Sequence, residues 1–366
     1  MSNIVYLLGA GASFGKRDSN KPEIDVLEKL PNSARINKHH AANIIEGLPL
    51  VTEIPGRLAF VINKIENYKY SINAKNKKLP IDSNNGKPFQ SALNTLINDL
   101  KWLKEECTRH ATIDTFAKKL YLKGKLDEFY KVESLLSVFF IIEQVINKKD
   151  GRYDTFLASV LNSDLNIDDR ITILTWNYDS QFELAYREYS DEKDASIIRK
   201  KLGITDLKDQ SYGTHNQIFK LNGTANFINQ IDISKYDSLN EDLIVELLDS
   251  YFKGIDNQKT NSRISFAWDN KKYIEDNFYD VLKNTIQDAN VLIVIGYTFP
   301  FFNREIDRKL FEAMRDLRII YIQDPNASNI VSNIDSTISH KNIFLNRNKK
   351  IEAITNTSQF YLPPEL

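Results

Sequence analysis

The stretch Val5-Tyr6-Leu7-Leu8-Gly9-Ala10-Gly11-Ala12-Ser13 lies almost at the start of the chain, and the fold can be worked out from it. Its apolar first half is typical of a strand that is buried on both faces, as strands of parallel sheets are. Its second half is a turn of small residues, where no bulky side chain hinders the approach of backbone N–H groups to a phosphate. The stretch therefore predicts a strand followed by a nucleotide-binding turn.

The composition is that of an ordinary globular protein. Of the 366 residues, 42% are hydrophobic and 27% are charged, so the chain has enough apolar side chains for a large core. A formal net charge of −1 provides no strong basic field for nucleic acid and no acidic tail for a basic partner. The length accommodates one large domain that carries a sizeable insertion.

The single cysteine, Cys107, cannot form an internal disulfide, and no cysteine cluster is present that would bind zinc. No run reaches the ~18 apolar residues of a membrane helix, and the chain begins directly with a strand rather than a leader. We therefore expect a cytoplasmic protein with no metal site and no contact with membranes.

Five short apolar segments predict the strands of a parallel sheet, with helices between them. The segments are residues 3–8, 170–175, 217–221, 290–295 and 319–322. We expect a Rossmann-like α/β fold with helices on both faces of the sheet. Residues 56–161 show only helical periodicity and predict an all-helical insertion, which leaves 1–55 and 162–366 for the nucleotide-binding domain. Residues 16–43 are polar and predict a surface excursion.

Every predicted strand ends in small or polar residues. These strand ends are Gly9-Ala10-Gly11-Ala12-Ser13, Trp176-Asn177-Tyr178-Asp179, Asn222-Gly223-Thr224, Gly296-Tyr297-Thr298-Phe299 and Gln323-Asp324-Pro325. Ligands of parallel sheets bind at the carboxyl ends of the strands, so these five segments predict a nucleotide pocket.

Two common nucleotide motifs are absent. The dinucleotide fingerprint needs a third glycine where the chain has Phe14, which argues against a conventional dehydrogenase. The phosphate loop needs Gly-Lys-Ser/Thr, and Gly15-Lys16-Arg17 does not meet that pattern.

The strand ends resemble motifs of the sirtuin family, in the same order along the chain. The resembling segments are Gly9-Ala10-Gly11-Ala12-Ser13, Gly47-Leu48-Pro49, Thr175-Trp176-Asn177-Tyr178-Asp179, Lys220-Leu221-Asn222-Gly223-Thr224 and Gly296-Tyr297-Thr298-Phe299. The chain looks most like the bacterial sirtuin-like branch that hydrolyses NAD in anti-phage defence. It has the helical insertion of that branch and lacks the zinc cysteines of protein deacylases.

The resemblance implies an NAD+ glycohydrolase that needs no metal and acts in abortive infection by depleting NAD. It also implies control by a separate sensor or regulatory protein, or by assembly into a homo-oligomer. By resemblance, Asn177 hydrogen-bonds the ribose or the attacking water, and Asp179 lies near the nicotinamide or fixes its loop.

The remaining pocket residues are also implied by resemblance. Gly9, Ala10, Gly11, Ala12 and Ser13 would hold the pyrophosphate; Gly296, Thr298, Gln323 and Asp324 would hold the adenosine side; Pro49, Thr175, Trp176, Gly223 and Phe299 would complete the pocket. Trp176 has two open interpretations, as a wall of the nicotinamide pocket or as a residue that packs under the sheet.

Asn222 departs from the family, which has histidine there as a general base. An amide cannot accept a proton at neutral pH, and a lost base costs ~10²–10⁴-fold in rate. Three interpretations are open: an engineered inactivation, a natural enzyme that relies on positioning and electrostatics, or a silent module that binds NAD or ADP-ribose and signals through assembly. His215 lies seven residues before Asn222 and is expected in a surface loop.

Overall fold

The computed structural model describes residues 2–15, 47–74, 88–147, 149–209, 215–256, 261–269, 277–338 and 350–366. The predicted excursion over 16–43 lies outside these residues. The chain forms two compact units. The first contains Met1–Lys16, Asp150–Thr224 and Ser265–Leu366, and the second contains Arg17–Lys149 and Ala225–Ile264.

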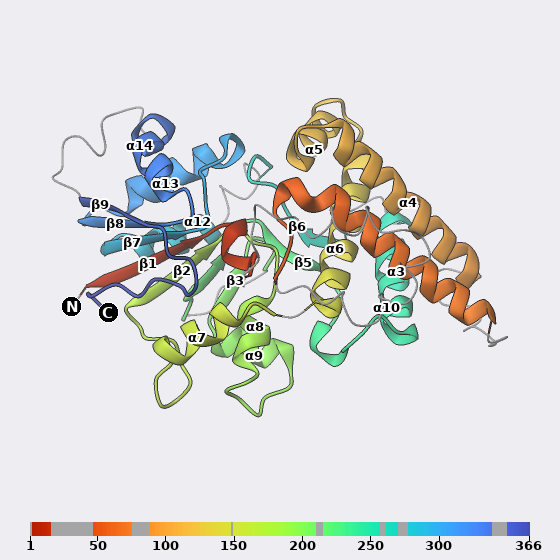
Figure 1. Ribbon diagram of the computed structural model, residues 1–366, viewed down its shortest axis with the longest axis horizontal. Helices are drawn as coiled ribbons and strands as arrows, with labels where there is room; N and C mark the ends of the chain where they lie inside the picture. The colour runs from red at the N-terminus through yellow and green to blue at the C-terminus, as the bar shows by residue number, and fades with distance from the viewer. Residues whose placement is uncertain are drawn as a thin grey trace. The chain divides into compact units, whose positions relative to one another are not determined.

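A seven-stranded parallel sheet forms the centre of the first unit (Figure 1). Its strands are β1 (Asn3–Leu8), β2 (Ile171–Thr175), β3 (Ile204–Asp206), β4 (Ile218–Lys220), β7 (Ala289–Ile295), β8 (Ile319–Gln323) and β9 (Lys350–Ile354). They lie in the order β3-β4-β2-β1-β7-β8-β9, so β1 is central and the five predicted strands are neighbours. This confirms the predicted α/β, Rossmann-like architecture.

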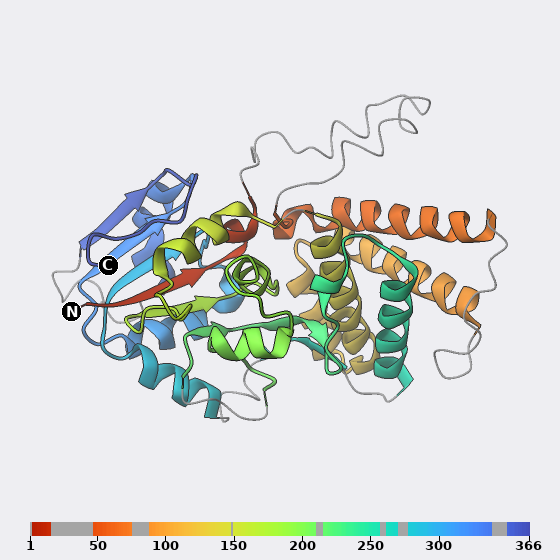
Figure 2. The same cartoon turned by 90° about the horizontal axis from the view of Figure 1, so that it is seen from below.

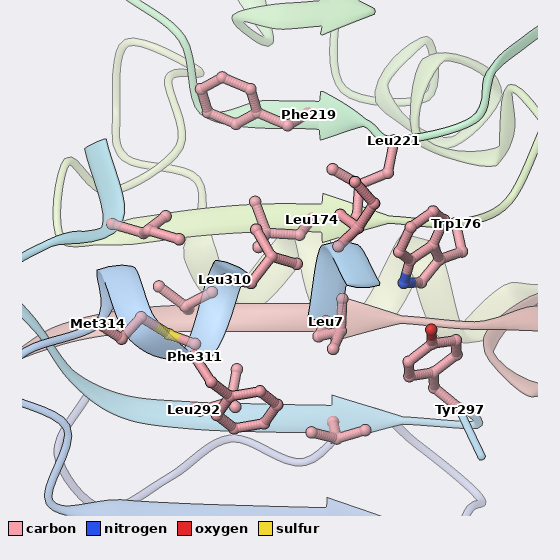
Figure 3. Close-up of a cluster of buried hydrophobic side chains, with 14 of the residues drawn as sticks. Leu7, Leu174, Trp176, Phe219, Leu221, Leu292, Tyr297, Leu310, Phe311 and Met314 are labelled. Atoms are coloured by element: carbon pink, nitrogen blue, oxygen red, sulfur yellow. The ribbon is translucent and has the colours of Figure 1, made fainter. Parts of the chain in front are cut away.

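Both faces of the sheet are buried, which explains why its strands read as continuous apolar runs. Along β1, Val5 and Leu7 point into one core and Ile4, Tyr6 and Leu8 into the other. Figure 3 shows the first of these cores, in which Leu7, Leu174 and Leu292 of the sheet pack under Leu310, Phe311 and Met314.

Helices cover the two faces (Figures 1 and 2). On one face lie α12 (Asn277–Ile286), the short η4 (Phe301–Asn303), α13 (Arg304–Ala313) and α14 (Ala327–Ile338); on the other lie α7 (Gly151–Val160), α8 (Gln181–Tyr186) and α9 (Ala195–Lys201). The side chains of α7 belong to the sheet core through Tyr153, Phe156 and Leu157. For that reason α7 belongs to the first unit, although residues 151–161 fall within the predicted insertion.

The second unit is built around α6 (Leu126–Ile146), which is buried on nearly all sides. The other elements of this unit are η2 (Val51–Glu53), α3 (Ile54–Ala74), α4 (Phe89–Arg109), α5 (Ile113–Leu122), η3 (Ile233–Lys235), α10 (Glu241–Asp256) and a two-stranded sheet of β5 (Gly223–Phe227) and β6 (Ser262–Ile264). The first two residues of β5 belong to the first unit. Residues 225–264 thus extend this unit beyond the predicted insertion and add strands to it. No helix in the described part of the chain has the length and apolar character to cross a membrane.

The turn after β1 packs directly against the turn after β7. The N–H of Gly9 donates to the carbonyl of Ile295, and the N–H of Gly11 donates to the carbonyl of Gly296, both at 3.0 Å. A Cβ on Gly9 would lie 2.6 Å from the Gly296 oxygen, and one on Gly11 would lie 2.7 Å from the Gly296 Cα. The close approach that requires these glycines is therefore between two segments of backbone.

Gly296→Ala should strongly destabilise the protein. Gly296 has a φ of +57°, and a Cβ there would lie 2.5 Å from the nitrogen of Ala12. We expect a loss of at least ~3 kcal/mol in the free energy of unfolding, measured by urea denaturation. Gly124→Ala is the matched control, because Gly124 has a φ of +68° with nothing within 4 Å of the added Cβ. It should cost only ~1 kcal/mol. Equal losses in the two variants would show that the contact between the turns is unimportant.

Candidate functional site

The carboxyl ends of β4, β2, β1, β7 and β8 lie next to one another because these strands are consecutive in the sheet. The sheet therefore brings together the five predicted strand ends at one edge, where parallel α/β sheets bind ligands. Pro49 belongs to the second unit, and its place in the pocket stays a prediction.

The hydroxyl of Ser13 connects the ends of β1 and β2. Ser13 Oγ donates to Asp179 Oδ2 at 2.6 Å and accepts from Asn177 Nδ2 at 3.0 Å. A third hydrogen bond, of 2.7 Å, joins Ser13 Oγ to the hydroxyl of Tyr153. A serine hydroxyl has one proton and two lone pairs, so with Asp179 as its acceptor it must accept from Tyr153. The proton and both lone pairs of the Ser13 hydroxyl are then used in hydrogen bonds within the protein.

Asn177 is oriented by the same interactions. Its Nδ2 donates to the carbonyl of Gly9 at 2.8 Å as well as to Ser13, and its backbone N–H donates to Thr175 Oγ1 at 3.0 Å. Both amide protons of the side chain are therefore used within the protein. What Asn177 can offer a ligand is its carbonyl oxygen, which accepts a hydrogen bond from a hydroxyl or a water.

Asp179 is almost fully buried, and its carboxylate holds its own loop. Besides Ser13, it accepts from the backbone N–H of Gln181 at 3.1 Å. Burial raises the pKa of Asp179 above its ordinary value, and the nearby Lys220 ammonium and the Ser13 bond oppose that rise. Of the two predicted roles for Asp179, these contacts favour that of fixing the loop.

Asn222 also has unused hydrogen-bonding capacity at this edge. It is 8% exposed, and its Nδ2 donates to the carbonyl of Trp176 at 3.4 Å. Its Oδ1 is buried and has no hydrogen-bond partner within the described part of the chain. A buried acceptor without a donor is costly, and a hydrogen bond from a ligand hydroxyl would remove that cost.

A buried group of charges supports the ends of β3 and β4. Lys220, only 1% exposed, donates to the backbone carbonyl of Asp179 and lies 3.5 Å from Glu183 Oε1. Arg199 joins Glu183 to Asp206, at 3.2 Å and 3.3 Å. No sequence motif quoted above gives a role to these charged residues. The signal that could have found it is a lysine within the apolar strand Ile218-Phe219-Lys220-Leu221.

Two residues that follow β4 and were predicted in the pocket, Gly223 and Thr224, have structural roles here. Thr224 Oγ1 donates to Asp206 Oδ2 at 3.0 Å. Gly223, at the start of β5, has a φ of +75° and allows the chain to turn out of the parallel sheet after Asn222.

Trp176 packs within the sheet core, which is the second of its two interpretations. It is 5% exposed and stacks on Tyr297, with ring centroids 6.0 Å apart and planes inclined by 18° (Figure 3). The Tyr297 hydroxyl donates to both carboxylate oxygens of Asp307, at 3.0 Å and 2.8 Å. Burial raises the pKa of Asp307 well above its ordinary range. Phe299 is buried beside Tyr297 with a φ of +53°.

The predicted adenosine side is less suited to a ligand than the other strand ends. Gln323 Nε2 donates to the carbonyls of Asn356 and Gln359, each at 2.6 Å, and its Oε1 accepts from the N–H of Tyr361 at 3.0 Å. Both the nitrogen and the oxygen of the Gln323 side-chain amide are thus bonded to the C-terminal segment. Asp324 is half-buried and accepts from the N–H of Asn326, while Thr298 is exposed.

The turn after β1 also offers fewer groups to a phosphate than its sequence suggested. Besides the bonds of Gly9 and Gly11 to the β7 side, the N–H of Ala12 donates to the carbonyl of Gly9 at 2.9 Å. At least three of the five N–H groups from Gly9 to Ser13 are therefore used within the protein.

His215, the described histidine of the first unit, lies away from this edge. His215 Nε2 hydrogen-bonds Gln217 Oε1 at 2.8 Å, and Gln217 binds the carbonyls of Ile167 and Asp168, which precede β2. His215 is therefore at the amino end of the sheet. His110 lies at the end of α4 in the second unit, and His39, His40 and His340 fall outside the described residues. No group of three or more potential metal ligands is found in the ranges given above.

Comparison with models of protein families gives no match, and no curated protein sequence matches the chain either. The resemblance to sirtuins therefore stays a prediction from the quoted motifs. The chemistry of the site has to be derived from its geometry.

The raised pKa of Asp179 predicts how stability depends on pH. Because the unfolded carboxyl ionises near its ordinary pKa of 3.8, and the folded one at a higher pH, raising the pH across this interval favours the unfolded chain. The stability of the wild type relative to Asp179→Asn should therefore be largest near pH 4 and decrease toward neutral pH. Urea denaturation of both proteins from pH 4 to pH 8 measures this difference, and parallel curves would contradict it.

Proposed function

We propose that this protein hydrolyses NAD+ at the bond between nicotinamide and ribose, releasing nicotinamide and ADP-ribose. The observation that carries the proposal is the buried Oδ1 of Asn222, which has no hydrogen-bond donor in the described residues. It lies at the same sheet edge as Asn177, whose side chain also has a carbonyl oxygen to offer. Two such acceptors suit a ligand with neighbouring hydroxyls, such as ribose.

The reaction passes through an oxocarbenium-like ribose as nicotinamide leaves. The site has to hold the ribose hydroxyls, keep competing nucleophiles out and orient one water. In the proposed reaction Asn222 and Asn177 accept hydrogen bonds from the ribose or the water. Ser13 and Asp179 hold Asn177 and its loop in place. Asn222 cannot take a proton, so the rate rests on positioning and electrostatics.

A silent module that binds NAD or ADP-ribose is the second candidate. The observation that favours it is that position 222 holds an amide, which cannot accept a proton, while His215 lies at the opposite edge of the sheet. Binding would then be the signal, transmitted through assembly or to a partner protein.

The resemblance to the anti-phage branch extends the proposal to a biological role. Depletion of NAD would stop infected cells from supporting the phage. Activation would come from a separate sensor protein or from self-association in the cytoplasm. Loss of protection against phage in cells that carry Asn177→Ala would support this role.

Nicotinamide release from NAD tests the proposal directly. Wild type should release nicotinamide slowly, and Asn222→His should raise the rate by ~10²–10⁴-fold because it supplies a base. Asn177→Ala should abolish release, whereas Asn290→Ala should leave it unchanged, since Asn290 lies at the amino end of β7.

Each outcome separates the two candidates. Tight binding of ADP-ribose with no turnover in wild type or in Asn222→His would favour the silent module. Full activity of Asn177→Ala would exclude the role given to Asn177.

A further inference from the structure

The first turn of α7 contacts the Gly9–Gly15 turn at four places. Its residues Asp150, Arg152 and Tyr153 are all buried, with exposures of 0%, 3% and 1%. None of them was singled out in the sequence, where Asp150-Gly151-Arg152-Tyr153 looks like an ordinary capped start of a helix.

Arg152 binds the carbonyls of the turn. Its Nη2 donates to the oxygen of Gly11 at 3.2 Å and to that of Ala12 at 3.0 Å. The same guanidinium forms a buried ion pair with Asp150, through Nε at 3.0 Å to both carboxylate oxygens. The charge of Arg152 is thus compensated locally, so its effect on the turn is one of geometry rather than of long-range attraction.

Asp150 and Tyr153 complete the contact. Asp150 Oδ2 accepts from the N–H of Gly15 at 3.0 Å, and the Tyr153 hydroxyl donates to Ser13 Oγ at 2.7 Å. Two carbonyls, one hydroxyl and one N–H group within residues 11–15 are therefore bound by the side chains of Asp150, Arg152 and Tyr153.

The Arg152 guanidinium also contacts the C-terminal segment of the chain. Its Nη1 donates to the carbonyl of Thr357 at 3.3 Å, and the Phe360 ring lies 5.3 Å from its central carbon. Only an arginine has donors in enough directions for these contacts, since a lysine has a single nitrogen. Lysine would keep the charge and lose the geometry.

We propose that Asp150, Arg152 and Tyr153 are positioning residues of the site. They hold the turn so that Ser13 Oγ stays within reach of Asn177, and Ser13 in turn keeps the Asn177 amide in one orientation. The carbonyl oxygen of Asn177 is then available to a ribose hydroxyl. This role rests on the proposed NAD site, but the fixed orientation of Asn177 is a property of the protein without ligand.

Tyr153→Phe is the sharpest test because it removes one hydroxyl and keeps the ring. Tyr186→Phe is the matched control, since Tyr186 is equally buried in the same core and its hydroxyl donates to the carbonyl of Leu165 at 3.0 Å, away from the turn. With ADP-ribose as the probe in calorimetry, Tyr153→Phe should weaken binding about tenfold and Tyr186→Phe by less than about twofold.

A second pair of variants tests Arg152. Arg152→Lys should weaken ADP-ribose binding by about tenfold or more although it keeps the charge. Its control is Arg170→Lys, because Arg170 forms the same local pair with Asp168 two residues before it, at the amino end of β2. Equal affinities of Tyr153→Phe and Tyr186→Phe, or of Arg152→Lys and Arg170→Lys, would overturn the proposal.

The side-chain amide protons of Asn177 provide a readout that needs no ligand. Their NMR signals, assigned with Asn177→Asp, should exchange slowly with solvent in wild type and in Tyr186→Phe, and fast in Tyr153→Phe. Equal protection in the two phenylalanine variants would overturn the positioning role. Slow exchange in wild type without any binding of ADP-ribose or NAD would instead refute the proposed function.

Discussion

The three hydrogen bonds of the Ser13 hydroxyl determine where the polar side chains at the carboxyl end of the sheet lie. Through them the end of β1 is tied to Asn177 and Asp179 after β2 and to Tyr153 on α7. This is possible because Gly11 and Gly296 allow the turn to pack on the neighbouring strand end. The turn of small residues, which was expected to bind a phosphate, thus first connects the ends of β1, β2 and β7 within the protein.

Much of the fold could be predicted from the sequence because the central strands are apolar on both faces. Ile171–Thr175 and Ala289–Ile295 are buried along almost their whole length. The edge strands β3 and β9 could not be predicted, since three residues of β3 show no periodicity and β9 is half-exposed and charged. Periodicity also placed α7 in the insertion, because only tertiary packing shows which core receives Tyr153 and Phe156.

The site was predictable as a set of strand ends but not as a set of interactions. Parallel strands bring Asn177, Asp179 and Asn222 to one edge, which the sequence indicates. The structure adds that Ser13, Asn177 and Asp179 satisfy one another, and that Asn222 does not share in this network. Gln323 was expected at the adenosine side, yet its amide binds the C-terminal segment, a contact with a sequence separation that no local pattern reveals.

The claim that Asn222 Oδ1 receives a ligand hydroxyl is tested most directly by a crystal structure with ADP-ribose. We predict that a ribose hydroxyl lies within ~3 Å of Asn222 Oδ1, with Asn177 Oδ1 as a second acceptor and the bonds of Ser13 unchanged. ADP-ribose bound elsewhere, or bound with Asn222 Oδ1 still lacking a donor, would contradict this account.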